Sequence, residues 1–86
     1  MYYVYLIKSK NSDKLYLGYT NNLKRRLQEH NRGVGGKYTK FNFPLELIYY
    51  EAYKSENDAK QREERLKLHK RAYAQLKKRI KKSLDN

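Results

Sequence analysis

The N-terminal stretch "YYVYLIKSKNSDKLYLGYT" (residues 2–20) has the pattern of a β-hairpin. Its two ends, residues 2–9 and 15–20, are rich in the aromatic and aliphatic residues that favour strands. The residues between them are the polar types found in short turns. Because an isolated hairpin is only marginally stable, at least one further strand must complete the sheet.

A third strand is predicted at residues 45–53, "LELIYYEAY". Its apolar run suggests a central, well-covered place in the sheet. Before it, "TNN" (residues 20–22) supplies an N-cap for a helix over about residues 22–31. Three glycines in "NRGVGGK" (residues 31–37) end this helix and open a loop.

Helical patterns follow the third strand. Ser55 is the expected N-cap of the first, with Asp58 three residues later, close to a capping box. Residues 71–82 repeat the helical period of apolar residues, and the chain then ends in a short tail. The sequence therefore predicts an α+β fold, a three-stranded antiparallel sheet flanked by helices in the order β-β-α-β-α-α, in one domain over residues 1–86.

The composition excludes several classes of protein. The 86 residues include no cysteine, which excludes disulfides and thiolate metal sites. No apolar run reaches the length of a membrane span. The first residues carry neither the basic segment nor the cleavage signal of a secreted protein. We therefore expect a cytoplasmic protein that does not insert into a membrane.

The positive charge is large and unevenly distributed. The formal net charge is +12, and residues 65–86 carry 9 lysines and arginines against 1 acidic residue. Such a surface predicts a polyanionic partner, although many small basic proteins use their charge only for solubility. The basic tail has no strong aromatic face to insert into lipid, so nucleic acid is the expected partner.

Three polar side chains are predicted to face inward from helices. In "LKRRLQEH" (residues 23–30), Arg26 and His30 lie on the same helical stripe as the two leucines. Glu63 lies on the apolar stripe of the later helix. A structural role would let Arg26 extend its charged head to water and His30 end the helix with a hydrogen bond. An acid and a base aimed inward from different helices favour a functional site.

The hairpin brings tyrosines to the same region. Tyr5 and Tyr16 fall on one face of the two strands, where they can stand close together. Gly18 removes a side chain from that face and lets another group approach. A tyrosine-rich packed sheet would explain the same pattern without any function.

Together these residue types suit phosphodiester chemistry. The carboxylate of Glu63 can hold one divalent cation, which prefers hard oxygen ligands and neutralises the phosphate. Arg26 can stabilise charge on the phosphate oxygens. A tyrosine oxygen can take the proton from the attacking water, and His30 can relay it.

These residues and their order resemble the GIY-YIG nuclease family, over about residues 2–70. The family's two motifs correspond to "YVY" (residues 3–5) and "YLG" (residues 16–18). Its arginine and histidine follow at eight and twelve residues after Gly18, and "AKQREERLK" aligns Glu63 with its glutamate. Tyr3 departs from the family's glycine, and could narrow the site or supply a stacking surface.

The resemblance implies an endonuclease that cleaves DNA with one Mg²⁺ or Mn²⁺ ion bound at Glu63. It implies that Tyr5 or Tyr16 is the general base, that Arg26 binds the phosphate and that His30 assists proton transfer. Small stand-alone members end, like this chain, in a basic helix. Structure-directed cutting in DNA repair or recombination is one expectation for such a member.

Two further interpretations stay open: a nucleic-acid-binding module without useful catalysis, and an RNA-associated structural protein. Both would use the basic and aromatic surface, and no protein partner can be inferred. The residues that we predict to contact nucleic acid are Lys24, Arg25, Arg32, Lys37, Tyr38, Lys40, Lys77, Lys78, Lys81 and Lys82.

Overall fold

The computed structural model describes residues 1–32 and 44–85. Three strands and four helices lie in these ranges, and their order agrees with the predicted one, with the last helical stretch divided in two. The elements are β1 (Tyr2–Ser9), β2 (Leu15–Thr20), α1 (Leu23–Asn31), β3 (Leu45–Tyr53), α2 (Glu56–Leu68), α3 (Lys70–Arg79) and α4 (Lys81–Leu84). The predicted α+β fold and the bounds of the three strands are therefore confirmed.

The sheet has the order β2-β1-β3, with both strand pairs antiparallel. The prediction that the third strand is central is wrong, because β1 holds that place and β3 is an edge. β1 is apolar on both faces, with four consecutive buried residues, Val4 to Ile7. In β3, by contrast, Tyr50 is 52% exposed. A run of apolar residues shows that a strand is covered, but it does not show how many neighbours the strand has.

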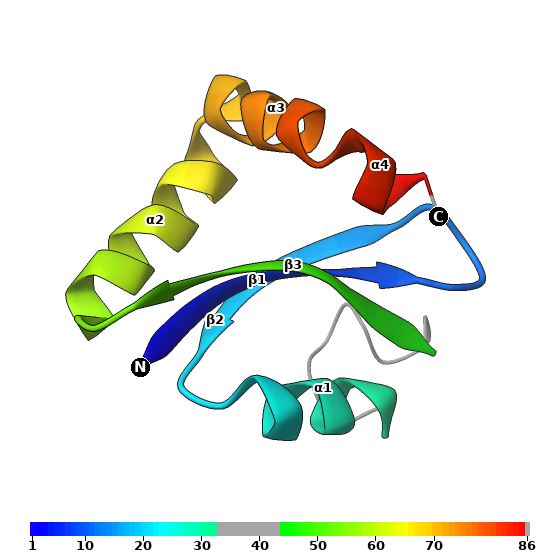
Figure 1. Cartoon of the computed structure of the whole chain (residues 1–86), viewed down its shortest axis with the longest axis horizontal. Coiled ribbons are helices and arrows are strands. Elements are labelled where there is room, and N and C mark those ends of the chain that lie inside the picture. Colours follow the sequence, from blue (N-terminus) through cyan, green and yellow to red (C-terminus); the bar gives the residue numbers. More distant parts are fainter. Residues whose placement is uncertain (33–43, 86) are drawn as a thin grey trace.

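Helices cover both faces of the sheet, as Figure 1 shows, with α1 on one face and α2, α3 and α4 on the other. Two clusters of buried residues result. Val4 packs with residues of α2 and α3, including Leu66 and Leu76. Tyr5 and Ile7 point to the opposite face, toward α1. Alternate residues of β1 therefore supply the centre of each cluster.

The predicted helix starts are confirmed by their caps. The side chain of Asn22 accepts a hydrogen bond from the backbone N–H of Arg25 at 3.0 Å. Ser55 accepts one from the N–H of Asp58 at 3.4 Å. None of the helices in the described ranges is long and apolar enough to cross a membrane.

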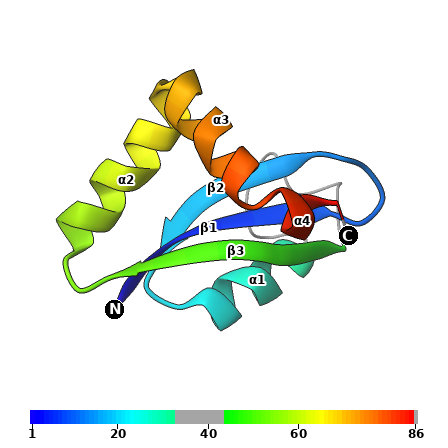
Figure 2. The same ribbon diagram turned by 45° about the horizontal axis from the view of Figure 1, so that its top comes forward.

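The C-terminal helical segment is divided in two places. His69 has extended backbone (φ −116°, ψ 100°) between α2 and α3, so the chain turns there, as Figure 2 shows. The predicted single helix over residues 71–82 is interrupted at Ile80, which separates α3 from α4. The amine of Lys8 donates a hydrogen bond to the backbone carbonyl of Leu84 at 2.7 Å, which ties α4 to β1.

The end of α1 is fixed to the start of β3 by one side chain. The amide of Asn31 donates to the carbonyl of Leu45 at 3.1 Å and accepts from its N–H at 2.6 Å. This pair of bonds holds α1 against the sheet on the same face as Tyr5.

Candidate active site

The Tyr5 hydroxyl is the centre of the candidate site. Tyr5 lies in the middle of β1 and only 5% of it is exposed. Its hydroxyl is hydrogen-bonded to Nε2 of His30 at 3.0 Å, and the two rings meet edge to face at 5.9 Å. The predicted inward direction of His30 is therefore observed, and it brings α1 and β1 together.

Gly18 makes room for this hydroxyl. The register places Gly18 directly opposite Tyr5. A Cβ atom built on Gly18 would lie only 2.6 Å from Cζ of Tyr5, closer than real Cβ contacts. The absence of a side chain at Gly18 therefore lets the Tyr5 ring lie across the edge strand β2.

Arg26 reaches the same hydroxyl from α1. Its guanidinium donates a hydrogen bond to the carboxylate of Glu29 at 3.2 Å and lies within hydrogen-bonding reach of the Tyr5 hydroxyl. Burial lowers the pKa of Arg26, but these two interactions outweigh it and raise the pKa above its usual value. Arg26 is therefore charged. Because 32% of its side chain is exposed, a dissolved anion can reach it.

The protonation of the Tyr5 and His30 pair follows from their surroundings. Burial raises the pKa of Tyr5, and this effect outweighs the opposing influence of Arg26. Burial and the nearby charge of Arg26 lower the pKa of His30. At neutral pH, the pair is therefore a neutral phenol beside a neutral imidazole.

Glu63 approaches Tyr5 from the other side of the sheet. Its charge contributes to raising the pKa of Tyr5, so the two groups are within electrostatic reach. The Glu63 side chain is 20% exposed and forms an ion pair with Lys67 at 3.4 Å. A partly exposed carboxylate of this kind fits one hard divalent cation that keeps water and substrate oxygens as its other ligands. Within the described ranges, no group of three His, Cys, Asp or Glu could hold a metal ion.

Tyr16 occupies a different place from Tyr5. It lies on the same face of the hairpin, but its partner in the ladder is Ile7. Its ring is half-buried against the cluster of Tyr5, Ile7 and Leu45. The two predicted tyrosines are thus diagonal neighbours, and it is the hydroxyl of Tyr5 that bonds to His30.

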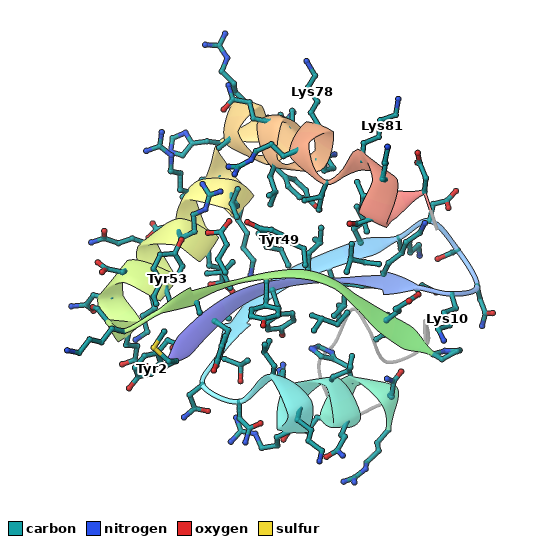
Figure 3. All side chains as sticks on the ribbon, viewed as in Figure 1. Tyr2, Lys10, Tyr49, Tyr53, Lys78 and Lys81 are labelled. Carbon is teal, nitrogen blue, oxygen red and sulfur yellow. The ribbon has the colours of Figure 1, made fainter. Side chains whose placement is uncertain are left out.

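The predicted nucleic-acid contacts differ in exposure. Lys77 is half-buried, with its amine 4.5 Å from the centre of the Tyr73 ring. Lys78 and Lys81 point away from the sheet, as Figure 3 shows. The other predicted residues in the described ranges are exposed as well: Lys24, Arg25, Arg32 and Lys82. Lys37, Tyr38 and Lys40 lie outside the described residues.

A carboxylate network that was not predicted from the sequence joins β3 to α2. Each oxygen of Glu51 accepts one bond from Arg62 and one from a tyrosine: Arg62 donates at 2.9 and 3.1 Å, Tyr53 at 2.5 Å and Tyr49 at 2.7 Å. The alternation of these residues in "YYEAY" (residues 49–53) was the available signal, because Tyr49, Glu51 and Tyr53 must share one face. Arg62 precedes Glu63, so the network fixes α2 to β3 beside the candidate metal ligand.

The network also changes the ionisation of its members. Burial, followed by the neighbouring Glu51 carboxylate, raises the pKa of Tyr49 and of Tyr53 to about 12. Burial opposes ionisation of Glu51, but the hydrogen bonds from Arg62 and the two tyrosines outweigh it and lower the Glu51 pKa. Glu51 is therefore an anion held by a full set of donors.

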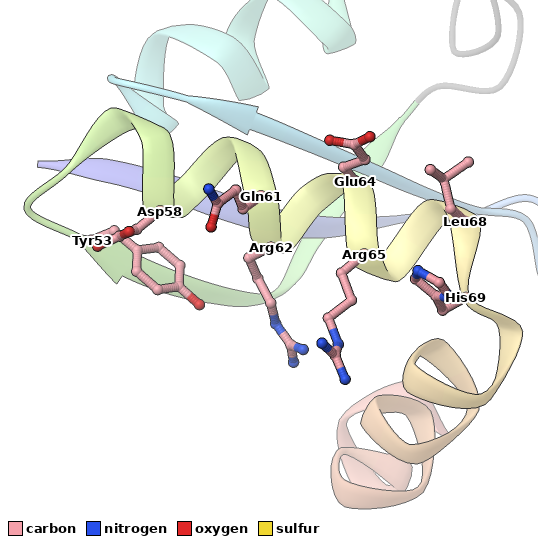
Figure 4. Close-up of a pocket in the computed structure, with 8 residues that line it drawn as sticks. All are labelled: Tyr53, Asp58, Gln61, Arg62, Glu64, Arg65, Leu68 and His69. Atoms are coloured by element: carbon pink, nitrogen blue, oxygen red, sulfur yellow. The ribbon is translucent and has the colours of Figure 1, made fainter.

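Two of the hollows in the described part of the chain bear on the site. The one in Figure 4 has a volume of about 480 Å³, and its lining includes residues of both charges, among them Asp58 and Arg65. A smaller one of about 320 Å³ lies where β2 ends and where α1 and α2 begin, and Arg26 is part of its wall. The smaller hollow is therefore the one that adjoins the candidate active site.

The described fold is a three-stranded antiparallel sheet with helices on both faces, and the chain belongs to the GIY-YIG family. Residues 1–82 match the family model described as the GIY-YIG catalytic domain. The family places the chain in a nuclease superfamily, whose substrates are nucleic acids.

The chain is similar to small proteins named UPF0213. It is 44% identical to one from Clostridium perfringens over 63 residues, which are 73% of this chain and 67% of that protein. It is 44% identical to one from Staphylococcus haemolyticus over 66 residues, 77% of this chain and 79% of that protein. The solution NMR structure of a UPF0213 protein from Bacillus halodurans has 36% identity and a TM-score of 0.52, and the match covers 88% of this chain and 82% of that one.

Proposed function

We propose that this protein is a metal-dependent endonuclease that hydrolyses phosphodiester bonds in DNA, with Tyr5 as the general base. The single observation that supports this role best is the hydrogen bond of 3.0 Å between the Tyr5 hydroxyl and Nε2 of His30, with the guanidinium of Arg26 close enough to influence the same hydroxyl. Tyr16, the alternative base, lacks this relation to His30 because its ladder partner is Ile7.

The proton path runs from the attacking water through Tyr5 to His30. Because burial keeps Tyr5 a phenol at neutral pH, its own proton must leave before it can accept another. The neutral imidazole of His30 takes that proton on Nε2, while the phenol oxygen takes one from water. The water oxygen bonds to phosphorus, the bond from phosphorus to the leaving sugar oxygen breaks, and that oxygen takes a proton from solvent.

Arg26 stabilises the charge that develops on the phosphate. Its guanidinium is held in place by Glu29 and by the Tyr5 hydroxyl, so it needs little reorganisation when the anion arrives. It also stabilises a developing negative charge on the Tyr5 oxygen during proton transfer.

Glu63 would hold one Mg²⁺ or Mn²⁺ ion. A bound ion of this kind neutralises charge on the phosphate and on the leaving oxygen. Lys67 pairs with the Glu63 carboxylate and would release it to the ion. One active site of this kind makes a single cut, so cleavage of both strands would need two protomers or two events.

The first test is cleavage of labelled single-stranded, duplex and branched DNA with Mg²⁺ or Mn²⁺, for the wild type and Glu63→Gln. We expect Glu63→Gln to bind DNA but to cut at least about a hundredfold more slowly. Glu64→Gln is the matched control, because Glu64 is the exposed neighbour on the same helix, and it should cut normally. If the wild type binds every substrate and cuts none, the protein is a binding module and not a nuclease.

A further inference from the structure

The hollow beside Arg26 has the composition of a nucleotide subsite. Its volume is about 320 Å³, within the range of small-ligand pockets. Its wall includes two tyrosines, an amide and two guanidinium groups: Tyr2, Tyr19, Asn21, Arg25 and Arg26. Aromatic rings beside cations are what a base with its phosphate requires.

Tyr19 is held in place as one wall of this hollow. It lies near the end of β2 and is a half-buried residue that packs against the core cluster of Val4 and Leu66. Its hydroxyl donates to Glu56 at 3.3 Å, and the amine of Lys60 lies 5.8 Å from the ring centre. A ring fixed in this way loses little conformational freedom when a base stacks on it.

Two arginines and two carboxylates line the hollow, and the amine of Lys60 lies beside it at Tyr19. Its two carboxylates already have cationic or hydroxyl partners: Glu29 pairs with Arg26 at 3.2 Å and with Arg25 at 4.0 Å, and Glu56 binds the Tyr19 hydroxyl. The side chain of Arg25 is 55% exposed and is within 3.3 Å of the Asn21 side chain. Arg25 and Arg26 are consecutive in α1, so two phosphates one nucleotide apart can each meet one guanidinium.

We propose that this hollow binds the nucleotide next to the scissile phosphate, with its base against Tyr19 and its second phosphate on Arg25. The inference rests on the proposed function in one respect, which is that Arg26 holds the scissile phosphate. Beyond that function, the proposal adds a contact to the base of the nucleotide, which stacks on Tyr19 whatever its identity. Tyr19 is thereby a substrate-positioning residue.

The test uses thymidine 3′,5′-bisphosphate and its counterpart without a base, deoxyribose 3′,5′-bisphosphate. Binding is measured by NMR titration of the whole chain in EDTA, so that no cleavage is needed. The wild type should bind the thymidine compound about tenfold more tightly than the abasic one. Tyr19→Leu, which keeps the apolar contact with the core, should remove this preference. Tyr50→Leu, at an exposed tyrosine of the opposite edge strand, should retain it.

A second variant keeps the test decisive if Tyr19→Leu does not fold. Arg25→Gln changes an exposed side chain and should weaken the binding of both bisphosphates to a similar degree. Equal affinity of the wild type for the two compounds, or a preference that persists in Tyr19→Leu, would overturn the inference. A chain that shows the preference but never cuts DNA fails the proposed function alone, and one that cuts DNA without the preference fails this inference alone.

Discussion

The Tyr5 side chain has two roles that usually belong to different residues. Its ring is part of the buried cluster between β1 and α1, and its hydroxyl is the centre of the candidate site. Because only 5% of the residue is exposed, the surrounding side chains hold the ring, and with it the hydroxyl, as firmly as any other core residue. A reactive group supported by a core needs few other residues to orient it, which suits a chain of 86 residues.

Tyr5→Phe separates these two roles. The ring remains, so we expect the free energy of unfolding to fall by only about 1 kcal/mol for the lost hydrogen bond to His30. Cleavage should slow by at least about a hundredfold, since the general base is removed. Thermal unfolding and single-turnover cleavage measure the two effects.

Tyr16→Phe is the matched control, at the second predicted tyrosine. We expect it to retain most of the cleavage rate. The reverse result, an active Tyr5→Phe and an inactive Tyr16→Phe, would make Tyr16 the general base and leave the Tyr5 and His30 pair a structural hydrogen bond.

The pH dependence of cleavage should report on His30. Burial and Arg26 lower its pKa below the usual 6.5, so the neutral, proton-accepting form persists to lower pH than for an exposed histidine. The cleavage rate should therefore stay constant as the pH falls to 6.5 and decline only below it. A rate profile in Mn²⁺ measures this, and an acid limb above pH 6.5 would contradict it.

At the scale of elements, α2 depends on the Glu51 network for its place on the sheet. The buried residues of α2 are Ala59 and Leu66, a small apolar anchor for a helix of 13 residues. Arg62 adds two charged hydrogen bonds to β3 on one flank of the helix. Because Glu63 is the next residue, any rotation of α2 about its axis would move the proposed metal ligand.

Arg62→Met should therefore reduce both stability and activity. It leaves the largely buried Glu51 without its cationic partner, and we expect a loss of about 2 kcal/mol in the free energy of unfolding. The double variant Arg62→Met with Glu51→Gln should recover part of that loss, because the unpaired charge is gone. Chemical denaturation measures both, and a double variant less stable than Arg62→Met would contradict the role given to the network.

The same network predicts the pH range of stability. The Glu51 pKa is lowered in the folded state, so its contribution is present above the ordinary value of 4.5 and is lost as the pH falls below it. The pKa of Tyr49 and of Tyr53 is raised from 10 to about 12, so folding resists their ionisation, and stability falls as the pH rises over that interval. In Glu51→Gln, the free energy of unfolding should depend less on pH in both the acidic and the alkaline range. Urea unfolding curves over a series of pH values measure this.

Local patterns in the sequence were enough to predict most elements. Hydrophobic period and cap residues depend on neighbours in the chain, so the strand bounds and the caps at Asn22 and Ser55 could be predicted. The same periodicity predicted that Arg26 and His30 point inward from their helix, and they lie on the face of the sheet toward which Tyr5 points. The edge position of β3 and the network of Glu51 with Arg62 depend on contacts between distant segments, which no local pattern contains.

At the scale of the whole molecule, the basic surface should determine how binding responds to salt. Lys78, Lys81 and Lys82 are exposed on α3 and α4. If each meets one phosphate, replacing all three with glutamine should reduce the slope of log affinity against log salt for duplex DNA by about 3. Fluorescence anisotropy over a range of salt concentrations measures the slope.

Three other exposed lysines give the control, namely Lys10, Lys14 and Lys54, which lie outside the predicted contact set. Their replacement changes the net charge by the same amount and should leave the slope nearly unchanged. Equal slopes for the two triple variants would show that the salt dependence of DNA binding follows the total charge of the protein and not the lysines of α3 and α4.

The place of β1 has a consequence for the order in which the molecule is made. β1 emerges from the ribosome before every other described element, and β2 follows closely enough to pair with it at once. Its second neighbour, β3, begins only at Leu45, 36 residues after β1 ends at Ser9, and α2 and α3 arrive later still. Until then one edge and much of both faces of β1 are open to pairing with another chain. During synthesis, the strand that later holds both cores together is thus the segment most in need of protection from other chains.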